Sequence, residues 1–162
     1  MDDVRKMLIN ESFTLRGVIL YATVTIERKI DDFLSDYFCS AKATGNELKE
    51  MLWKTERINL GSKKDILFML LNRHYKPFLK KYPKFITMLE DFIPHRNILA
   101  HLELDMSDIS KEAGGLIFMK YKEGKLVKKK YSAETVIKLK NDISELAKIL
   151  DDLILTNNAP SD

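Results

Sequence analysis

Residues 11–38 read ESFTLRGVILYATVTIERKIDDFLSDYF, a long stretch whose pattern decides the fold class. Its apolar side chains recur at steps of three and four residues, which places them on one stripe of an α-helix. The stripe consists of Leu15, Val18, Ile19, Ala22, Ile26, Ile30, Phe33, Leu34 and Tyr37. A long helix with one apolar side is typical of a bundle, in which other helices cover that side.

Further segments carry the same periodicity. We expect a short lead-in helix over residues 1–9 and longer helices over 47–56, 63–75, 83–104 and 133–155. Polar residues that suit the N-cap position precede three of them, namely Asn46, Ser62 and Ser132. Short connections between these helices favour packing against one another in a bundle.

Prolines interrupt the middle of the chain. Pro77 and Pro83 bracket a loop or a broken helix end, because proline lacks the N–H that a helix interior needs. Pro94 falls inside the segment 83–104, so we expect a kink or a restart there.

Residues 116–131 depart from the helical pattern. LIFMKY and LVKKKY flank Lys122-Glu123-Gly124-Lys125, and the glycine supplies the positive φ that a tight hairpin needs. The predicted fold is therefore all-α, a bundle of four to five helices with one small β-hairpin before the last helix. We expect a single domain over residues 1–156 and a disordered tail over 157–162.

Composition limits the class of protein. The chain has 162 residues, 45% of them apolar, and a net charge of only +3, so any nucleic-acid role needs a local basic patch. The single Cys39 excludes an internal disulfide and a multi-cysteine metal site, and no C-x2–4-C pair exists to complete a zinc site with histidines, so we expect no metal or cofactor. The N-terminus MDDVRK has no apolar signal core and no apolar run reaches about 20 residues, which predicts a cytoplasmic protein without a membrane span.

Residues 94–101 read PHRNILAH and concentrate polar side chains on a predicted helix. At about 100° per residue, Arg96, Asn97, Ala100 and His101 share one arc of the helix. The other arc carries Ile98, Leu99 and Leu102. The apolar arc suits the core and the polar arc suits a cleft or a partner, and Asn97 lies four residues before His101, close enough to orient the imidazole.

The segment Arg96-Asn97-Ile98-Leu99-Ala100-His101 resembles the R-N-x-x-x-H form of the motif of HEPN domains. These all-α bundles occur in bacterial toxins, phage-defence proteins and RNA-targeting effectors. The order of elements is similar too, from TIERKIDDFLSDYF through NLGSKKDI to a last helix entered at YSAE. The resemblance implies a metal-independent endoribonuclease, a toxin or phage-defence effector, that works as a homodimer with its cleft at the two-fold interface.

The resemblance implies roles for the motif residues. His101 would transfer a proton, since histidine titrates near neutral pH. Arg96 would stabilise charge on the phosphate with its planar fork, and Asn97 would hold the histidine or donate to the phosphate. A toxin subgroup carries a tyrosine two positions after the histidine, and Glu103 stands there in this chain. An antitoxin or defence partner is a candidate partner, but that mode of regulation is not expected.

Basic residues elsewhere suit RNA binding. Lysines alternate with tyrosines in 73–84 and 120–131, and charge combined with stackable rings suits single-stranded RNA. The predicted RNA contacts are His95, as an auxiliary phosphate contact, and Lys125, Lys128, Lys129 and Lys130. The alternative is that these lysines only solvate the hairpin and protect its edges.

Two other functions remain open on the sequence alone. A catalytically silent dimeric module, which binds a partner through its helices, could use the same bundle, because a fold does not assign chemistry. A module that binds RNA, nucleotides or another small ligand in the same cleft is the third reading.

Overall fold

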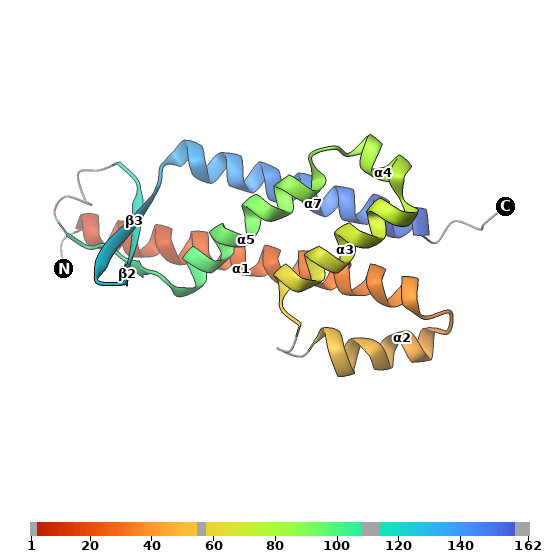
Figure 1. Ribbon diagram of the computed structural model, residues 1–162. Helices are drawn as coiled ribbons and strands as arrows, with labels where there is room; N and C mark the ends of the chain where they lie inside the picture. The colour runs from red at the N-terminus through yellow and green to blue at the C-terminus, as the bar shows by residue number, and fades with distance from the viewer. Residues whose placement is uncertain (1–2, 55–57, 108–113, 158–162) are drawn as a thin grey trace. The chain divides into compact units, whose positions relative to one another are not determined.

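The computed structural model describes residues 3–54, 58–107 and 114–157. The described chain is mostly helical, as the sequence predicts (Figure 1). Its described residues form six α-helices and one π-helix rather than four to five helices, and the predicted hairpin is part of a three-stranded antiparallel sheet. It divides into two compact units. The sheet unit comprises Met1–Thr23 and Pro94–Ile143, and the helical unit comprises Val24–Ile93 and Ser144–Asp162. Three helices contribute residues to both units, namely α1 (Asp3–Phe38), α5 (Phe85–His101) and α7 (Ala133–Asn157).

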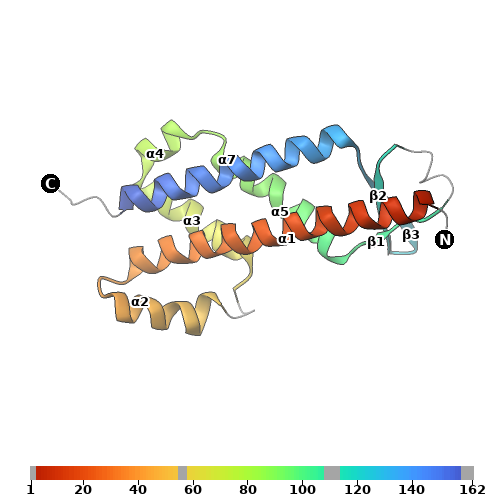
Figure 2. The same cartoon turned by 180° about the vertical axis from the view of Figure 1, so that it is seen from behind.

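The sheet unit holds the three described strands in the order β1-β2-β3 (Figure 2). β1 (Glu103–Leu104) pairs with β2 (Leu116–Lys122), and β2 pairs with β3 (Lys125–Tyr131), both antiparallel. Helix residues and one face of the sheet enclose its core, which includes Leu8, Leu15, Ile19, Leu99, Leu102, Leu116, Phe118, Tyr131 and Leu139.

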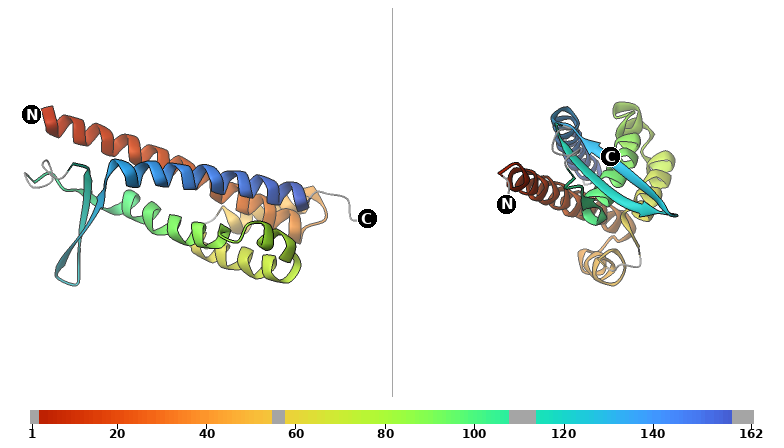
Figure 3. Two further views of the ribbon diagram at one scale, coloured as in Figure 1. Left: turned by 90° about the horizontal axis from the view of Figure 1, so that it is seen from above. Right: turned by 90° about the vertical axis from the view of Figure 1, so that its left-hand side faces the viewer.

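The predicted hairpin is confirmed. β2 and β3 form a twisted two-stranded ribbon, seen from two sides in Figure 3. Glu123 and Gly124 have φ of 52° and 75°, so both central residues of the turn are left-handed, as a two-residue hairpin of this twist requires. The turn closes with the pair Lys122 and Lys125.

The third strand was not predicted. β1 is two residues long, and two residues show no alternation that could separate a strand from the end of a helix. The helix predicted over residues 83–104 ends earlier than expected, at His101. Leu102 N donates the last helical hydrogen bond to Ile98 O at 2.9 Å, and Glu103 then pairs with Met119.

The helical unit combines parts of α1, α5 and α7 with four shorter elements. These are α2 (Lys42–Leu48), the π-helix η1 (Lys49–Trp53), α3 (Leu60–His74) and α4 (Lys76–Lys81). Its core is apolar and rich in leucine and phenylalanine. The core includes Ile26, Ile30, Phe33, Leu34, Trp53, Leu67, Leu71, Phe78, Phe85, Leu89, Phe92, Leu146, Leu150 and Leu153.

Several predicted helix ends are wrong. α1 runs unbroken from Asp3, so the expected lead-in helix over 1–9 is its first part. Asn46 lies inside α2 rather than capping a helix over 47–56, and a π-helix follows α2. Asn59, not Ser62, caps α3, because the Asn59 side chain accepts from Ser62 N at 3.0 Å. Ser132 caps α7 as predicted, since its Oγ accepts from Thr135 N at 3.2 Å.

The prolines break the chain less than expected. Pro77 lies in the first turn of α4, where the missing N–H costs no helical bond. α5 continues through Pro94. A proline inside a helix removes one backbone hydrogen bond, and the burial of Phe92 before it and Leu99 after it offsets that loss.

The C-terminal prediction falls partly outside the described residues. Asn157, the first residue of the expected disordered tail, ends α7 instead, and its side chain accepts a hydrogen bond of 2.5 Å from the Tyr75 hydroxyl. Residues 158–162 lie outside the described part of the chain. In that described part no helix is both long and apolar enough to span a membrane. The single domain over 1–156 stays a prediction.

Candidate functional site

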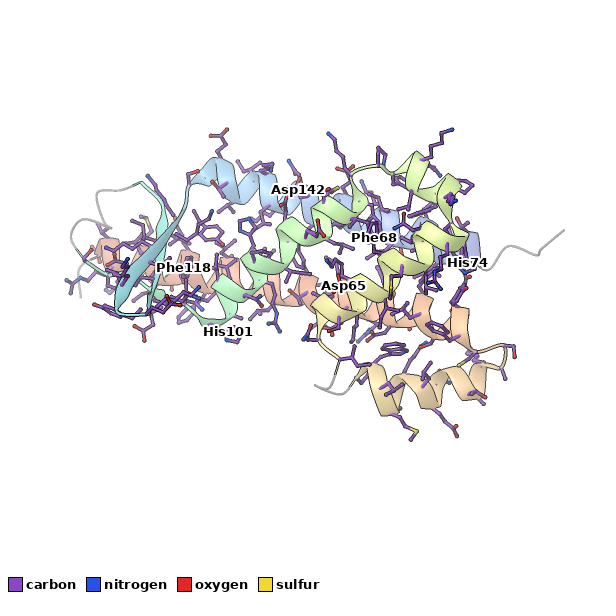
Figure 4. The ribbon with its side chains drawn as sticks, viewed as in Figure 1. Asp65, Phe68, His74, His101, Phe118 and Asp142 are labelled. Carbon is purple, nitrogen blue, oxygen red and sulfur yellow. The ribbon has the colours of Figure 1, made fainter. Side chains whose placement is uncertain are left out.

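The motif residues lie on the last two turns of α5, in the sheet unit. Leu99 is fully buried and Leu102 is 6% exposed, whereas Asn97 and His101 are exposed and Arg96 is half-buried. This burial follows the predicted division into an apolar and a polar arc. Figure 4 shows His101 at the end of the helix, with Phe118 on the neighbouring strand β2.

Arg96 and Asn97 bind each other. Arg96 Nη1 donates to Asn97 Oδ1 at 3.0 Å. The amide therefore holds the arginine, whereas the sequence had suggested that it holds the histidine or donates to the phosphate. The Nε of Arg96 is buried and has no acceptor among the described residues. A buried guanidinium donor without an acceptor is costly. His101, five residues later, has a solvent-exposed ring at the helix terminus.

Arg16 completes the end of α5, and sequence reasoning missed it. Its Nη1 and Nη2 donate to the carbonyl oxygens of Leu99 and Leu102, each at 2.5 Å. Its guanidinium also lies 4.8 Å from the centroid of the Phe118 ring. Burial lowers the pKa of Arg16 below its usual range, but a guanidinium stays charged at physiological pH.

The position of Arg16 explains why a charged side chain is favourable at this partly buried place. The last carbonyls of a helix lack helical partners and form the negative end of the helix dipole, so a cation there is stabilising. A sequence signal does exist. Ser12 and Thr23 are each 3% exposed, and with Arg16 and Ile19 they form a stripe of α1 that faces the protein interior. Ser12 Oγ accepts from Arg16 Nε at 3.3 Å.

His95 packs inside the sheet unit. Its Nδ1 lies 2.9 Å from the Tyr131 hydroxyl, and the two rings meet edge to face with centroids 5.5 Å apart. Burial raises the pKa of Tyr131 to about 12, so this hydroxyl stays protonated and can donate to His95. The structure thus gives His95 a packing partner in place of the open position expected of a phosphate contact.

The predicted hairpin lysines divide between two faces of the sheet. Residues paired across an antiparallel ladder share a face, and the faces alternate along each strand. Lys129 pairs with the buried Phe118, and Lys125 lies on the same face. Lys128 and Lys130 lie on the other face, where Lys128 Nζ forms an ion pair of 2.6 Å with the buried Asp105. The four predicted RNA contacts therefore form two pairs rather than one patch.

A buried charged cluster in the helical unit was also missed. Lys63 is 1% exposed, and its Nζ lies 2.7 Å from Glu27 Oε1, 2.9 Å from Asp31 Oδ1 and 2.6 Å from the Trp53 carbonyl oxygen. Desolvation by burial, only partly offset by Lys63, raises the pKa of Asp31 to about 6. The signal was available, because Lys63 precedes Leu67 and Leu71 by one and two turns on the apolar side of α3.

No metal site forms in the described part of the chain. None of its histidine, cysteine, aspartate and glutamate side chains gather in groups of three that could hold an ion. Cys39 is a half-exposed free thiol.

In comparisons with known proteins, no family model matches the chain, and no significant match was found among curated proteins or solved structures.

Proposed function

We propose that this chain is a metal-independent endoribonuclease of the HEPN type, with His101 and Arg96 as its catalytic pair. One observation carries the proposal. An exposed histidine ends α5 about 7.5 Å along the helix axis from an arginine whose buried Nε has no acceptor among the described residues. A phosphate group bound by the Nη atoms of Arg96 would lie near His101, a side chain that can act as base or acid.

The reaction needs no cofactor in this proposal. The ribose 2′-oxygen attacks the adjacent phosphorus, a new O–P bond forms, and the bond from phosphorus to the 5′-oxygen breaks. His101 takes the proton of the 2′-hydroxyl or gives one to the departing 5′-oxygen. Arg96 stabilises the added negative charge on the phosphorane, and Asn97 holds Arg96 through its Oδ1.

The proposal also includes the oligomeric state of the protein and its role in the cell. One histidine serves one proton transfer at a time, so we propose a homodimer in which two copies of His101 face one RNA, within a single HEPN-like bundle over residues 1–156. A toxin or phage-defence effector in the cytoplasm, with or without an antitoxin partner, is the setting that this proposal implies. Sedimentation equilibrium that finds only monomer at every accessible concentration would remove the two-histidine site.

The test is RNA cleavage in excess chelator. Wild-type protein should cleave at least one member of a broad RNA panel, and Arg96→Ala and His101→Ala should each lower the rate at least 100-fold, as expected for a group that transfers a proton or stabilises charge. The chain offers a matched control in Arg73→Ala and His74→Ala, an exposed arginine and histidine at the end of α3. These should cleave as wild type does. Equal losses in both pairs would contradict the assignment.

A second function is favoured by a different surface. In the sheet unit, α1 exposes Phe13 by 68%, Leu20 by 40% and Tyr21 by 76%, around the exposed Gly17. These residues lie within about 100° of one another on the helix, so they form an apolar stripe typical of a protein interface. A catalytically silent interaction module would use this stripe. Intact RNA across the panel, with a binding partner whose affinity falls in Phe13→Glu, would favour that function.

A further inference from the structure

Four lysines share one face of the β2–β3 ribbon. Lys120 and Lys122 lie at alternate positions of β2 after Phe118, and Lys125 and Lys129 lie on the same face of β3. All four are exposed. This set is the lysine face. Lys125 and Lys129 belong to the RNA contacts predicted from the sequence. Lys120 and Lys122 do not, and the strand register places them on the same face.

The lysine face has no compensating charge nearby. Within the described residues, none of its four lysines has an ion pair, in contrast to Lys128, which is held by Asp105. Residues 116–131 contain six lysines and one glutamate and so carry +5, whereas the whole chain carries +3. The rest of the chain is therefore at −2, and all of its excess positive charge is on this ribbon. Such a concentration attracts a polyanion.

The lysine face is linked to the end of α5. Phe118 is on the same face of β2, and its ring lies under the Arg16 guanidinium at 4.8 Å. Arg16 in turn binds the carbonyl oxygens of Leu99 and Leu102, the residues on either side of Ala100 and His101. A chain of direct contacts within the sheet unit therefore connects the basic face to the helix end that carries the candidate catalytic histidine.

We propose that the lysine face binds the phosphate backbone of RNA without reading its bases, and that it directs the strand toward the end of α5. The direction of the strand toward α5 rests on the proposed ribonuclease function, but the binding does not. The two exposed apolar side chains near the hairpin end, Tyr121 and Leu126, pair with each other on the opposite face. The lysine face thus offers charge without a stacking ring, and backbone contacts of this kind are insensitive to sequence.

The same distribution argues against a lipid surface. Peripheral membrane binding combines basic residues with large apolar side chains that enter the bilayer interface. On the lysine face the only exposed apolar side chain of the hairpin is Val127, at 44% exposure. Tyr121 and Leu126 lie on the face opposite the lysine face. An RNA backbone is the polyanion that fits this face.

The experiment measures RNA affinity against salt concentration. The probe is a 2′-O-methyl oligonucleotide, which lacks the attacking hydroxyl and so stays intact, in uridine-only and adenosine-only versions of equal length. The lysine-face variant changes Lys120, Lys122, Lys125 and Lys129 to Gln. A control variant with the same charge change converts four exposed lysines outside the hairpin and outside residues 73–84, namely Lys42, Lys138, Lys140 and Lys148.

Wild type and control should bind both probes with similar affinity and the same salt slope. Each lost phosphate contact lowers that slope by about 0.7 for single strands, so the lysine-face variant should lose up to about 3. An unchanged slope in that variant, an equal loss in the control, or no RNA binding by wild type would overturn the proposal. Vesicles of phosphatidylserine form a further arm, and lysine-dependent binding to them alone would overturn it in favour of lipid.

Two safeguards keep the outcome informative. If the fourfold variant melts earlier than wild type, the pair Lys122→Gln and Lys125→Gln at the hairpin end should still lose about half of the slope change. Failure of the two proposals can also be told apart. Binding with the predicted salt slope but no cleavage of unmodified RNA would contradict only the catalytic assignment. Cleavage of RNA together with a salt slope that does not change in the lysine-face variant would contradict only the RNA-binding role of the lysine face.

Discussion

Arg16 on α1 donates a hydrogen bond of 2.5 Å from Nη1 to the carbonyl oxygen of Leu99, 83 residues further along the chain. With its second bond to Leu102, it fixes where α5 ends and where His101 is presented. A single side chain thereby joins the first helix of the sheet unit to the candidate site. The same guanidinium contacts Phe118, so the strand that carries the lysine face is held as well.

Arg16→Ala should destabilise the protein by about 2–4 kcal/mol, because two helix-end carbonyls lose charged donors. For a chain of this size that corresponds to a fall in Tm of roughly 4–16 °C. Arg16→Lys keeps the charge but has no fork and should recover part of the loss. Arg28→Ala, at an exposed position of the same helix, is the control and should melt as wild type does. An Arg16→Ala protein with an unchanged Tm would show that the cap contributes nothing.

Leu99→Ala should cost roughly 2–5 kcal/mol, since Leu99 is fully buried and its removal leaves a cavity. His101→Ala should change stability by no more than about 0.5 kcal/mol, because its side chain is exposed. Denaturant titration of both variants measures the contrast. Early unfolding of His101→Ala, comparable to that of Leu99→Ala, would make His101 a structural residue.

The Lys63 cluster predicts a pH dependence of stability. Because burial raises the pKa of Asp31 to about 6 from 3.8, the folded protein binds more protons than the unfolded chain between these values. This group therefore favours folding most below about pH 4, and its contribution is lost as the pH rises to about 6. The difference amounts to on the order of 3 kcal/mol.

Asp31→Asn should remove this part of the pH dependence. Unfolding is followed by the fluorescence of Trp53, the chain's single tryptophan, which is 5% exposed and whose carbonyl accepts from Lys63. The quantity compared is the change in unfolding free energy from pH 4 to pH 7. Asp36→Asn, at an exposed position of α1, serves as the control and should keep the wild-type change. Identical changes in wild type and Asp31→Asn would refute the assignment.

Substitutions of Arg96 and of His101 should change the cleavage rate and its pH dependence in different ways. Arg96→Lys keeps a positive charge but loses the planar fork and its grip on Asn97, so cleavage should slow strongly while the shape of the pH–rate profile is preserved. His101→Ala should leave a low residual rate with little response between about pH 5.5 and 8. Single-turnover rates across this range measure both. A residual His101→Ala rate that keeps the wild-type profile would assign the proton transfer to another group.

The helices and the hairpin could be predicted because their signals are local. The stripe of α1 from Leu15 to Leu34 and the alternation around Gly124 need only neighbouring residues. The ends of elements were less predictable, since they depend on partners. The end of α5 depends on two distant partners, since Arg16 binds its last carbonyl oxygens and Glu103 pairs with Met119, 16 residues later in the sequence.

The residues of the candidate site were likewise predictable only where their signal is local in the sequence. Placing Arg96, Asn97 and His101 on one polar arc required only the period of a helix. The role of Arg16 required knowing that α1 meets the end of α5, and the lysine face required the strand register. The helical period places Lys63 on the apolar stripe of α3, but its burial as an ion follows only from its carboxylate partners Glu27 and Asp31, which lie on another helix.

The most direct measurement is the chemistry of the ends that the protein leaves on RNA in excess chelator. Attack by the 2′-oxygen forms a ring across the 2′ and 3′ positions, so wild type should produce 2′,3′-cyclic phosphate and 5′-hydroxyl ends, and His101→Ala should produce almost none. Mass spectrometry of the fragments identifies both ends. Intact RNA from the wild-type protein, 3′-hydroxyl and 5′-phosphate ends, or equal cleavage by His101→Ala would contradict the proposed function.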